Sequence, residues 1–131
     1  MDKIMVQQDR EFRVAVMVQD EEDNELHEVA HIHELSPYTM MLVSLGLCTG
    51  VVLHTYAQHH DIELELAEMT VTYHRDEHDG RGSDKGNDEW IEENLRLEGT
   101  LSAKEIERLE RVAHHCSIRK MLESGIEVHS D

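Results

Sequence analysis

The apolar and polar positions along the chain change their spacing several times, and each change predicts a new element. Residues 12–18, Phe-Arg-Val-Ala-Val-Met-Val, are rich in apolar and β-branched side chains and end at the polar, turn-favouring cluster 20–24. This arrangement predicts the beginning of a β-hairpin. Residues 26–35 alternate between two faces, neither of which is cleanly apolar, so we expect a strand or an extended segment there.

The strongest helix signal begins at Ser36-Pro37. Serine is a favoured N-cap and proline a favoured first helical residue, and good helix formers follow to about His60. Apolar and small side chains cover most of the circumference of this segment: Met40, Met41, Val43, Ser44, Leu45, Leu47, Cys48, Val51, Val52 and Thr55. A helix that is apolar all round is a buried helix. We therefore expect it at the centre of the domain or at a subunit interface.

Two further strands are predicted after this helix. Residues 62–73 alternate with period two, and a bend is expected near Ala67. Residues 74–88 contain three glycines among charged side chains, which predicts a mobile loop between two strands. The alternation resumes over residues 90–101, so the loop and its flanks predict a strand pair.

A capping box opens a second helix, because Ser102 is followed three residues later by Glu105. One apolar stripe follows, with Cys116 at its C-terminal continuation: Ile106, Leu109, Val112 and Ala113. The helix is expected to end at Ser124-Gly125, and residues 126–128 predict a short final strand. The order of N-terminal strands, long central helix, strand pair, second helix and short final strand predicts one α+β domain over residues 1–131.

The net charge of the chain limits the classes of partner that it can bind. Twenty-nine acidic residues stand against 12 basic ones, for a net charge of −17. Such a surface repels phosphate backbones and anionic membranes, so we expect no nucleic-acid and no membrane partner. The start, Met1-Asp-Lys-Ile-Met, lacks the basic and apolar pattern of a signal peptide, and no run approaches the roughly 18 apolar residues of a bilayer span. A soluble, cytoplasmic protein is the expectation.

Two cysteines and eleven histidines are the candidate chemistry. Cys48 and Cys116 are too few for a disulfide scaffold and are not spaced as a zinc ribbon or a C-x-x-C motif, so each is either core or a reactive thiol. Histidines cluster at three places: His31/His33, His59-His60-Asp61 and His114-His115-Cys116. None has the i, i+4 spacing of a helical zinc site, so we expect solvated histidines, with no metal and no organic cofactor.

Four stretches, in order over about residues 36–128, resemble the OsmC (osmotically inducible protein C) family, which includes the organic hydroperoxide resistance proteins. They are Ser36-Pro37-Tyr38 leading into Leu45-Gly46-Leu47-Cys48-Thr49, then Ile62-Glu-Leu-Glu-Leu66, then Leu97-Glu-Gly-Thr-Leu-Ser-Ala-Lys-Glu-Ile-Glu-Arg-Leu109, and last His115-Cys116-Ser-Ile-Arg-Lys-Met-Leu122. Both cysteines fall where the family has its own.

This resemblance implies an OsmC-like fold in an intertwined homodimer, with two long central helices wrapped by sheets and active sites at the subunit interface. It also implies that Cys48 attacks an organic hydroperoxide and becomes a sulfenic acid. Cys116 would then resolve this acid as an intramolecular disulfide, which a cellular dithiol reduces. On this interpretation the protein is a thiol-dependent peroxidase acting in the oxidative stress response.

The family's activating residues are not all present. A peroxidatic cysteine must be a thiolate, so its pKa must fall below the usual value of about 8.5. The peroxidase branches supply an arginine near the first hairpin and a glutamate in the first turn of the long helix. This chain has Tyr38 and Thr39 in that turn, and the arginine region reads Asp20-Glu-Glu-Asp-Asn-Glu25.

The candidates for a substitute activator are Arg119, Arg13 and His54, and Tyr38 and Thr39 are further candidates for activation or for the pocket, Tyr38 as an apolar wall with a hydroxyl. A smaller departure is Ser117, which follows Cys116 where many relatives have proline. The missing glutamate and arginine leave two other hypotheses open. One is a catalytically weak OsmC-fold protein that binds a small apolar ligand at the dimer interface, and the other is a metal-binding protein that uses the histidines and Cys116.

Overall fold

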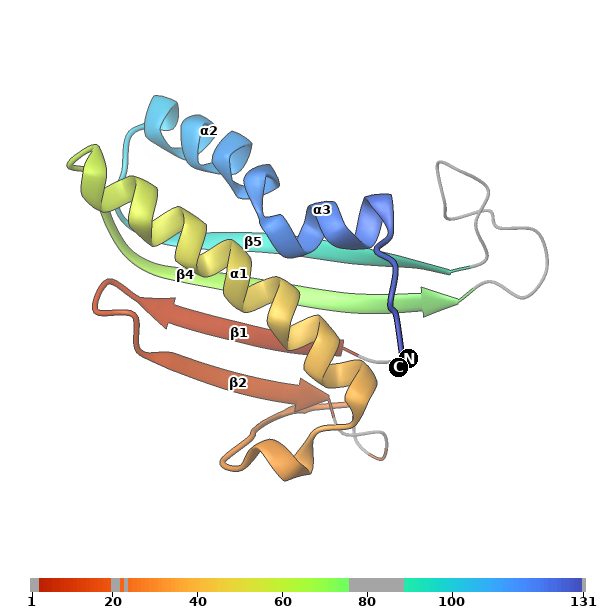
Figure 1. Cartoon of the computed structure of the whole chain (residues 1–131). Helices are drawn as coiled ribbons and strands as arrows, with labels where there is room; N and C mark the ends of the chain where they lie inside the picture. The colour runs from red at the N-terminus through yellow and green to blue at the C-terminus, as the bar shows by residue number, and fades with distance from the viewer. Residues whose placement is uncertain (1–2, 20–21, 23, 76–88, 131) are drawn as a thin grey trace.

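The computed structural model describes residues 3–19, 22, 24–75 and 89–130, which form a mixed α+β structure (Figure 1). This confirms the fold class predicted from the sequence. The loop predicted over residues 74–88 lies mostly outside the described residues. The elements are, in chain order, β1 (Lys3–Asp9), β2 (Val14–Gln19), β3 (Leu26–Glu28), the 3-10 turn η1 (Ile32–Glu34), α1 (Pro37–His59), β4 (Glu63–Arg75), β5 (Glu89–Thr100), α2 (Ala103–Val112), the 3-10 turn η2 (Ala113–His115) and α3 (Ser117–Ser124).

The strands form one antiparallel sheet in the order β3-β2-β1-β4-β5. The helices all lie on one face of this sheet, so the structure has two layers (Figure 1). β4 and β5 pair along almost their whole length, from Glu63 opposite Thr100 to Arg75 opposite Glu89. Their register shifts between Leu64 and Leu66, close to the bend predicted near Ala67.

α1 is the central element, as the sequence predicts. The Ser36 hydroxyl accepts a hydrogen bond from the Thr39 N–H at 3.1 Å, and Pro37 occupies the first helical position. The helix packs on β1 and β4, and its buried side chains join those of the two strands in the main core. Gly50 lets it approach the sheet closely, because a Cβ there would lie 2.5 Å from Gln8 Oε1 and 2.8 Å from Met69 Cε.

The predicted second helix is interrupted. α2 begins with the predicted capping box, in which Ser102 and Glu105 bond each other's backbone N–H. The chain then tightens into η2 and becomes extended at Cys116, with φ −72° and ψ 127°, before α3 starts. Cys116 is therefore the N-cap of a new helix and not a residue inside a continuous one.

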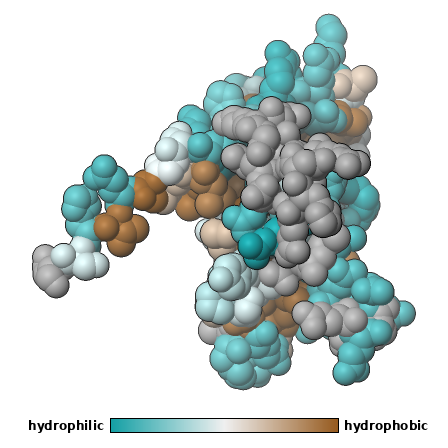
Figure 2. All heavy atoms as spheres, turned by 90° about the vertical axis from the view of Figure 1, so that its right-hand side faces the viewer, coloured by the Kyte–Doolittle hydropathy of each residue, from teal (hydrophilic) through white to brown (hydrophobic). Residues whose placement is uncertain are grey.

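Three other parts of the chain differ from what the sequence predicted. β1 was not predicted, although its inward positions Ile4, Val6 and Gln8 are buried. The extended segment predicted over 26–35 is a strand only at its start and ends in η1. Residues 126–128 form no strand, and Figure 2 shows this end of the chain projecting from the body with apolar side chains exposed. A strand needs a partner edge, and within the described chain this segment pairs with none.

Candidate functional site

The structure brings the two cysteines together. Cys48 lies in the middle of α1, Cys116 caps α3, and Cys48 Sγ lies 3.8 Å from the hydroxyl of Ser117, the residue that follows Cys116. Both are free thiols; Cys116 is fully buried, whereas Cys48 is partly exposed. Cys48 is therefore placed near Cys116 and is the more exposed of the two thiols.

The apolar stripe of α2 explains this placement. Leu109 and Ala113 are buried in the core cluster against α1, and Cys116 continues the same buried row. Because the helix breaks at Cys116, the first turn of α3 starts beside Cys48 with its backbone N–H groups unpaired within the helix. The buried stripe of α2 is thus followed by the start of a new helix, whose first N–H groups are available as hydrogen-bond donors.

The start of α3 places Ser117 beside the Cys48 sulfur. Ser117 Oγ lies 3.8 Å from Cys48 Sγ, within range for a hydrogen bond to sulfur. Burial by itself raises the pKa of Cys48, but hydrogen bonds from the Cys116 thiol, the Ile118 N–H, and the hydroxyl and N–H of Ser117 outweigh burial and lower the pKa below its usual value. Cys48 is therefore the thiol that ionises first.

Cys116 is shifted in the opposite direction. Burial raises its pKa, and so does its role as hydrogen-bond donor to Cys48, although the Arg119 N–H lies 3.4 Å from its sulfur and opposes the change. Cys116 thus keeps its proton to a higher pH than Cys48 does. Cys48 is therefore both the more exposed and the more acidic of the two thiols.

A carboxyl group lies beside the pair that the sequence interpretation missed. Glu93 on β5 shares the helix-facing side of the sheet with Ile91 and Leu95, and burial raises its pKa. Thr49 Oγ1, next to Cys48, lies 2.9 Å from Glu93 Oε2 and 3.1 Å from the Leu45 carbonyl oxygen. A hydroxyl has only one proton to donate. If Thr49 donates it to the Leu45 carbonyl, Thr49 can also hydrogen-bond Glu93 only when the Glu93 carboxyl is protonated and donates to Thr49 Oγ1. The signal in the sequence was an acid at an inward position of an alternating strand.

Of the predicted activators, the structure brings Arg119 to the pair and leaves the others elsewhere. The Arg119 backbone bonds Cys116, its charge acts on Glu93, and its guanidinium pairs with Glu123 at 3.6 Å. Arg13 is bound to Asp9 at 2.8 Å in the turn between β1 and β2.

His54, Tyr38 and Thr39 have other neighbours. The His54 Nε2 lies 2.7 Å from the Gln8 carbonyl oxygen. His54 is six residues after Cys48 and therefore lies on a different face of α1. Tyr38 is 70% exposed in the first turn of α1. Thr39 is buried and its hydroxyl donates to the Ser36 carbonyl at 2.9 Å, so it completes the helix cap.

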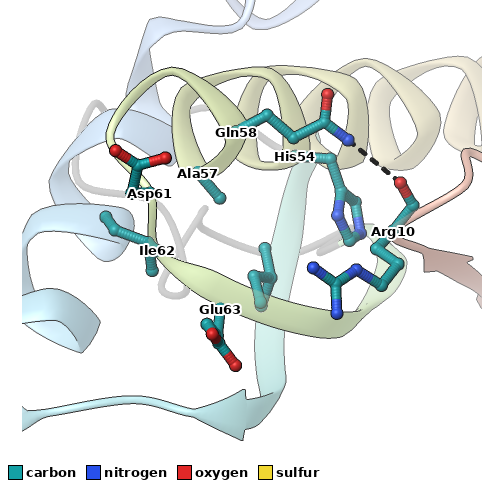
Figure 3. Close-up of a pocket in the computed structure, with 8 residues that line it drawn as sticks. Arg10, His54, Ala57, Gln58, Asp61, Ile62 and Glu63 are labelled. Atoms are coloured by element: carbon teal, nitrogen blue, oxygen red, sulfur yellow. Dashed lines mark hydrogen bonds between the residues drawn. The ribbon is translucent and has the colours of Figure 1, made fainter.

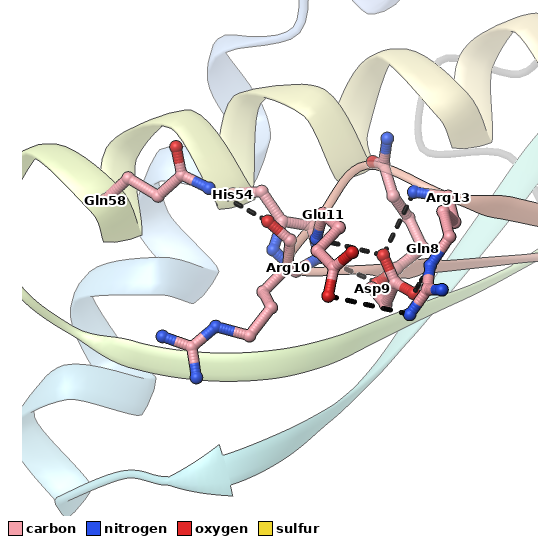
Figure 4. Close-up of polar contacts among 7 residues, drawn as sticks. All are labelled: Gln8, Asp9, Arg10, Glu11, Arg13, His54 and Gln58. Carbon is pink, nitrogen blue, oxygen red and sulfur yellow. Dashed lines mark hydrogen bonds and ion pairs between the residues drawn. The ribbon is translucent and has the colours of Figure 1, made fainter.

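A cavity of about 260 Å³ lies at the C-terminal end of α1, apart from the thiols (Figure 3). Arg10, Asp61 and Glu63 give its wall both signs of charge, and the buried His54 also lines it. Burial lowers the pKa of His54, which favours the neutral imidazole. The Gln58 amide donates to the Arg10 carbonyl at 3.0 Å and fixes the nearby turn (Figure 4).

The histidine clusters do not assemble a metal site in the part of the chain that the structure describes. No group of three or more His, Cys, Asp or Glu side chains is placed there to share a metal ion. His31 and His33 stack on each other with ring centroids 5.4 Å apart. By length and composition α1 is the one described helix apolar enough to cross a membrane, yet it packs on the sheet as a core element.

In the described part of the chain, a five-stranded antiparallel sheet, three helices on one face and two free thiols define the class: a two-layer α+β thiol protein. The family described as OsmC-like protein matches residues 30–131, and the chain therefore belongs to the OsmC-like family. The comparison with curated proteins gave no match.

One solved structure similar to this chain is a crystal structure of an OsmC-like hydroperoxide resistance protein from Jannaschia sp. CCS1. The TM-score is 0.54 at 9% sequence identity, covering 98% of this chain and 91% of that chain. At this identity the similarity shows the fold alone. The family resemblance inferred from the four sequence stretches is confirmed.

Proposed function

We propose that this protein is a thiol-dependent peroxidase that reduces organic hydroperoxides through Cys48 and Cys116. The observation that carries the proposal is the placement of Cys48 beside the first turn of α3, which Cys116 caps, together with the opposite directions of the pKa shifts of the two thiols. A lowered pKa makes Cys48 the nucleophile, and a raised pKa keeps Cys116 protonated until it is needed. Membership of the OsmC-like family supports a peroxide-related role.

The reaction balances over three steps. The Cys48 thiolate attacks the outer peroxide oxygen; the O–O bond breaks, the alkoxide takes a proton and leaves as an alcohol, and Cys48 becomes a sulfenic acid. Cys116 then attacks the Cys48 sulfur, its proton leaves with the hydroxyl as water, and a disulfide forms. A cellular dithiol reduces this disulfide by exchange and is itself oxidised to a disulfide.

A homodimer is part of this proposal. The outer face of α1 exposes Met40, Met41 and Val51, each 37–41% exposed, on the helix that also carries Cys48. A second copy covering this face would bury an apolar strip and extend an apolar wall beside the partly exposed Cys48. Such a wall suits the organic part of a hydroperoxide. A reducing cytoplasm would supply the dithiol.

Counting thiols during peroxide consumption tests the proposal. Protein reduced with dithiol and then freed of it is mixed with one equivalent of cumene hydroperoxide, and free thiols are counted in denaturant before and after. We expect the wild type to lose both thiols to an intramolecular disulfide, seen as a monomer band on a non-reducing gel and a mass loss of two hydrogen atoms. Cys48→Ser should consume no peroxide, and Cys116→Ser should stop at an oxidised Cys48.

Survival of both thiols in excess peroxide would refute the peroxidase function. The chain would then have kept the thiol pair without the reaction, and the binding of a small apolar ligand at the dimer interface would become the hypothesis to test. Loss of the single thiol of Cys48→Ser at the wild-type rate would instead show unspecific oxidation and would refute the assigned roles.

A further inference from the structure

The first residue of α3 lies beside Cys48. Ser117 Oγ is 3.8 Å from Cys48 Sγ, within hydrogen-bonding range for sulfur. The Ser117 hydroxyl, the Ser117 N–H and the Ile118 N–H all act to lower the pKa of the Cys48 thiol. These backbone groups have no partner inside α3, because the first N–H groups of a helix never do.

We propose that Ser117 stabilises the Cys48 thiolate, in place of a cationic side chain, and thereby sets the pH range in which the protein reacts. This inference rests on the proposed function for its biological meaning, although it concerns a property of the thiol that exists without peroxide. A thiolate is a strong acceptor, and donors at a helix N-terminus also bring the positive end of the helix dipole to the anion.

The other groups near Cys48 do not take this part. Cys116 also donates to the sulfur, but in the proposed reaction it must later give up its proton and attack. The Arg119 guanidinium pairs with Glu123, and its charge acts on Glu93. Glu93 faces Thr49, and an ionised carboxylate there would oppose a thiolate rather than help it.

Ser117→Pro is a substitution that the backbone accepts. Proline is favoured at the first position of a helix, where its missing N–H breaks no helical bond. The residue before a proline must be extended, and Cys116 already has φ −72° and ψ 127°. This variant therefore removes both donors of residue 117 while the fold is kept. Ser117→Ala removes only the hydroxyl, and Ser117→Thr restores one.

The test is the pH profile of Cys48 alkylation. Each protein is reduced, treated with iodoacetamide between pH 5 and 10, and digested with trypsin. Cleavage at arginine and lysine places Cys48 in the peptide 14–75 and Cys116 in 112–119, so mass spectrometry follows each thiol separately. Ser124→Ala, a serine at the far end of α3, is the matched control.

We expect the midpoint of the Cys48 profile to move to higher pH in the order wild type, Ser117→Ala, Ser117→Pro. The rate at pH 7 should fall on the order of threefold to tenfold for alanine and further for proline, because hydrogen bonds to charged groups are among the stronger ones. The plateau at high pH should stay the same, since a full thiolate reacts there in every variant. Ser117→Thr and Ser124→Ala should follow the wild type.

Coinciding midpoints in wild type and Ser117→Pro would overturn the inference, as would a lowered plateau without a shift, which would mean blocked access. The outcome is independent of the peroxidase test. If the midpoints shift but cumene hydroperoxide is not consumed, the inference about Ser117 stands and the proposed function fails. If peroxide is consumed with unshifted midpoints, the function stands and another group stabilises the thiolate.

Discussion

Gly99 lies at a point of β5 where the structure leaves no room for a side chain. It pairs with Leu64, next to the register shift in β4, and its φ of +152° belongs to a region that glycine alone adopts readily. A Cβ at Gly99 would lie 2.1 Å from the Glu63 carbonyl oxygen and 3.1 Å from the Glu65 nitrogen. Both neighbours are backbone atoms, so no side-chain rotation can relieve the overlap.

The cost of Gly99→Ala follows from these two effects. A residue with a Cβ held at such a φ costs about 1–3 kcal/mol. Overpacking in a well-packed region adds about 1–3 kcal/mol. We therefore expect a loss of roughly 2–6 kcal/mol, which is a large part of the 5–15 kcal/mol that is typical of a whole domain. β5 leads directly into α2, so the strain also acts on the helix that places Cys116.

Urea unfolding followed by far-UV circular dichroism, at one protein concentration for all variants, measures this loss. Gly125→Ala is the matched control, because Gly125 also has positive φ (+77°) but nothing lies within 4 Å of its Cβ position. The exposed tail after it can relax, so we expect a loss below about 1 kcal/mol. A Gly99→Ala protein as stable as the Gly125→Ala protein would refute the reasoning from backbone contact.

Two further predictions concern the buried carboxyl group beside Cys48 and the cap of α2. Because the pKa of Glu93 is raised in the folded state, its contribution to stability is present below the unfolded value near 4.5 and is lost as the pH rises through the folded pKa. Glu93→Gln should therefore melt above the wild type at pH 7, with the gain shrinking toward pH 4, and a gain equal at both pH values would contradict this. Ser102→Ala removes the capping box of α2 and should cost about 1 kcal/mol, or about 3 °C in calorimetry, with the exposed-tail variant Ser130→Ala unchanged as the control. An unchanged melting temperature for Ser102→Ala would show that the cap is dispensable.

The elements that the sequence predicted best are those whose signals are local. The cap at Ser36-Pro37, the capping box at Ser102 and the alternation of residues 62–73 depend on neighbours in the chain, and the structure confirms all three. β1 was missed because its inward row includes Gln8, which interrupts the apolar pattern although the residue is buried. The prediction of a final strand was wrong for the opposite reason. Ile126 and Val128 alternate with polar residues, but no sheet edge within the described chain pairs with them.

The thiol pair was predictable only through the family resemblance, and its environment was not predictable at all. The apolar stripe of α2 does not indicate that the helix ends before Cys116, because the residues on both sides of Cys116 are compatible with a continuous helix. Glu93 was hidden for a similar reason, since an acid in a strand is usually on the exposed face. Both features depend on contacts between segments far apart in the chain, Cys48 with Ser117 and Thr49 with Glu93.

Neutral donors beside Cys48 fit a protein with a net charge of −17. In such a chain a cation meets surplus carboxylates, and three arginines are indeed paired in this way: Arg13 with Asp9, Arg96 with Glu68 and Arg119 with Glu123. A hydroxyl and two backbone N–H groups carry no net charge, so distant carboxylates do not draw them away from the sulfur. The first turn of α3 can therefore hold a thiolate where an arginine would be neutralised, and the break of the helix at Cys116 is what makes that turn available.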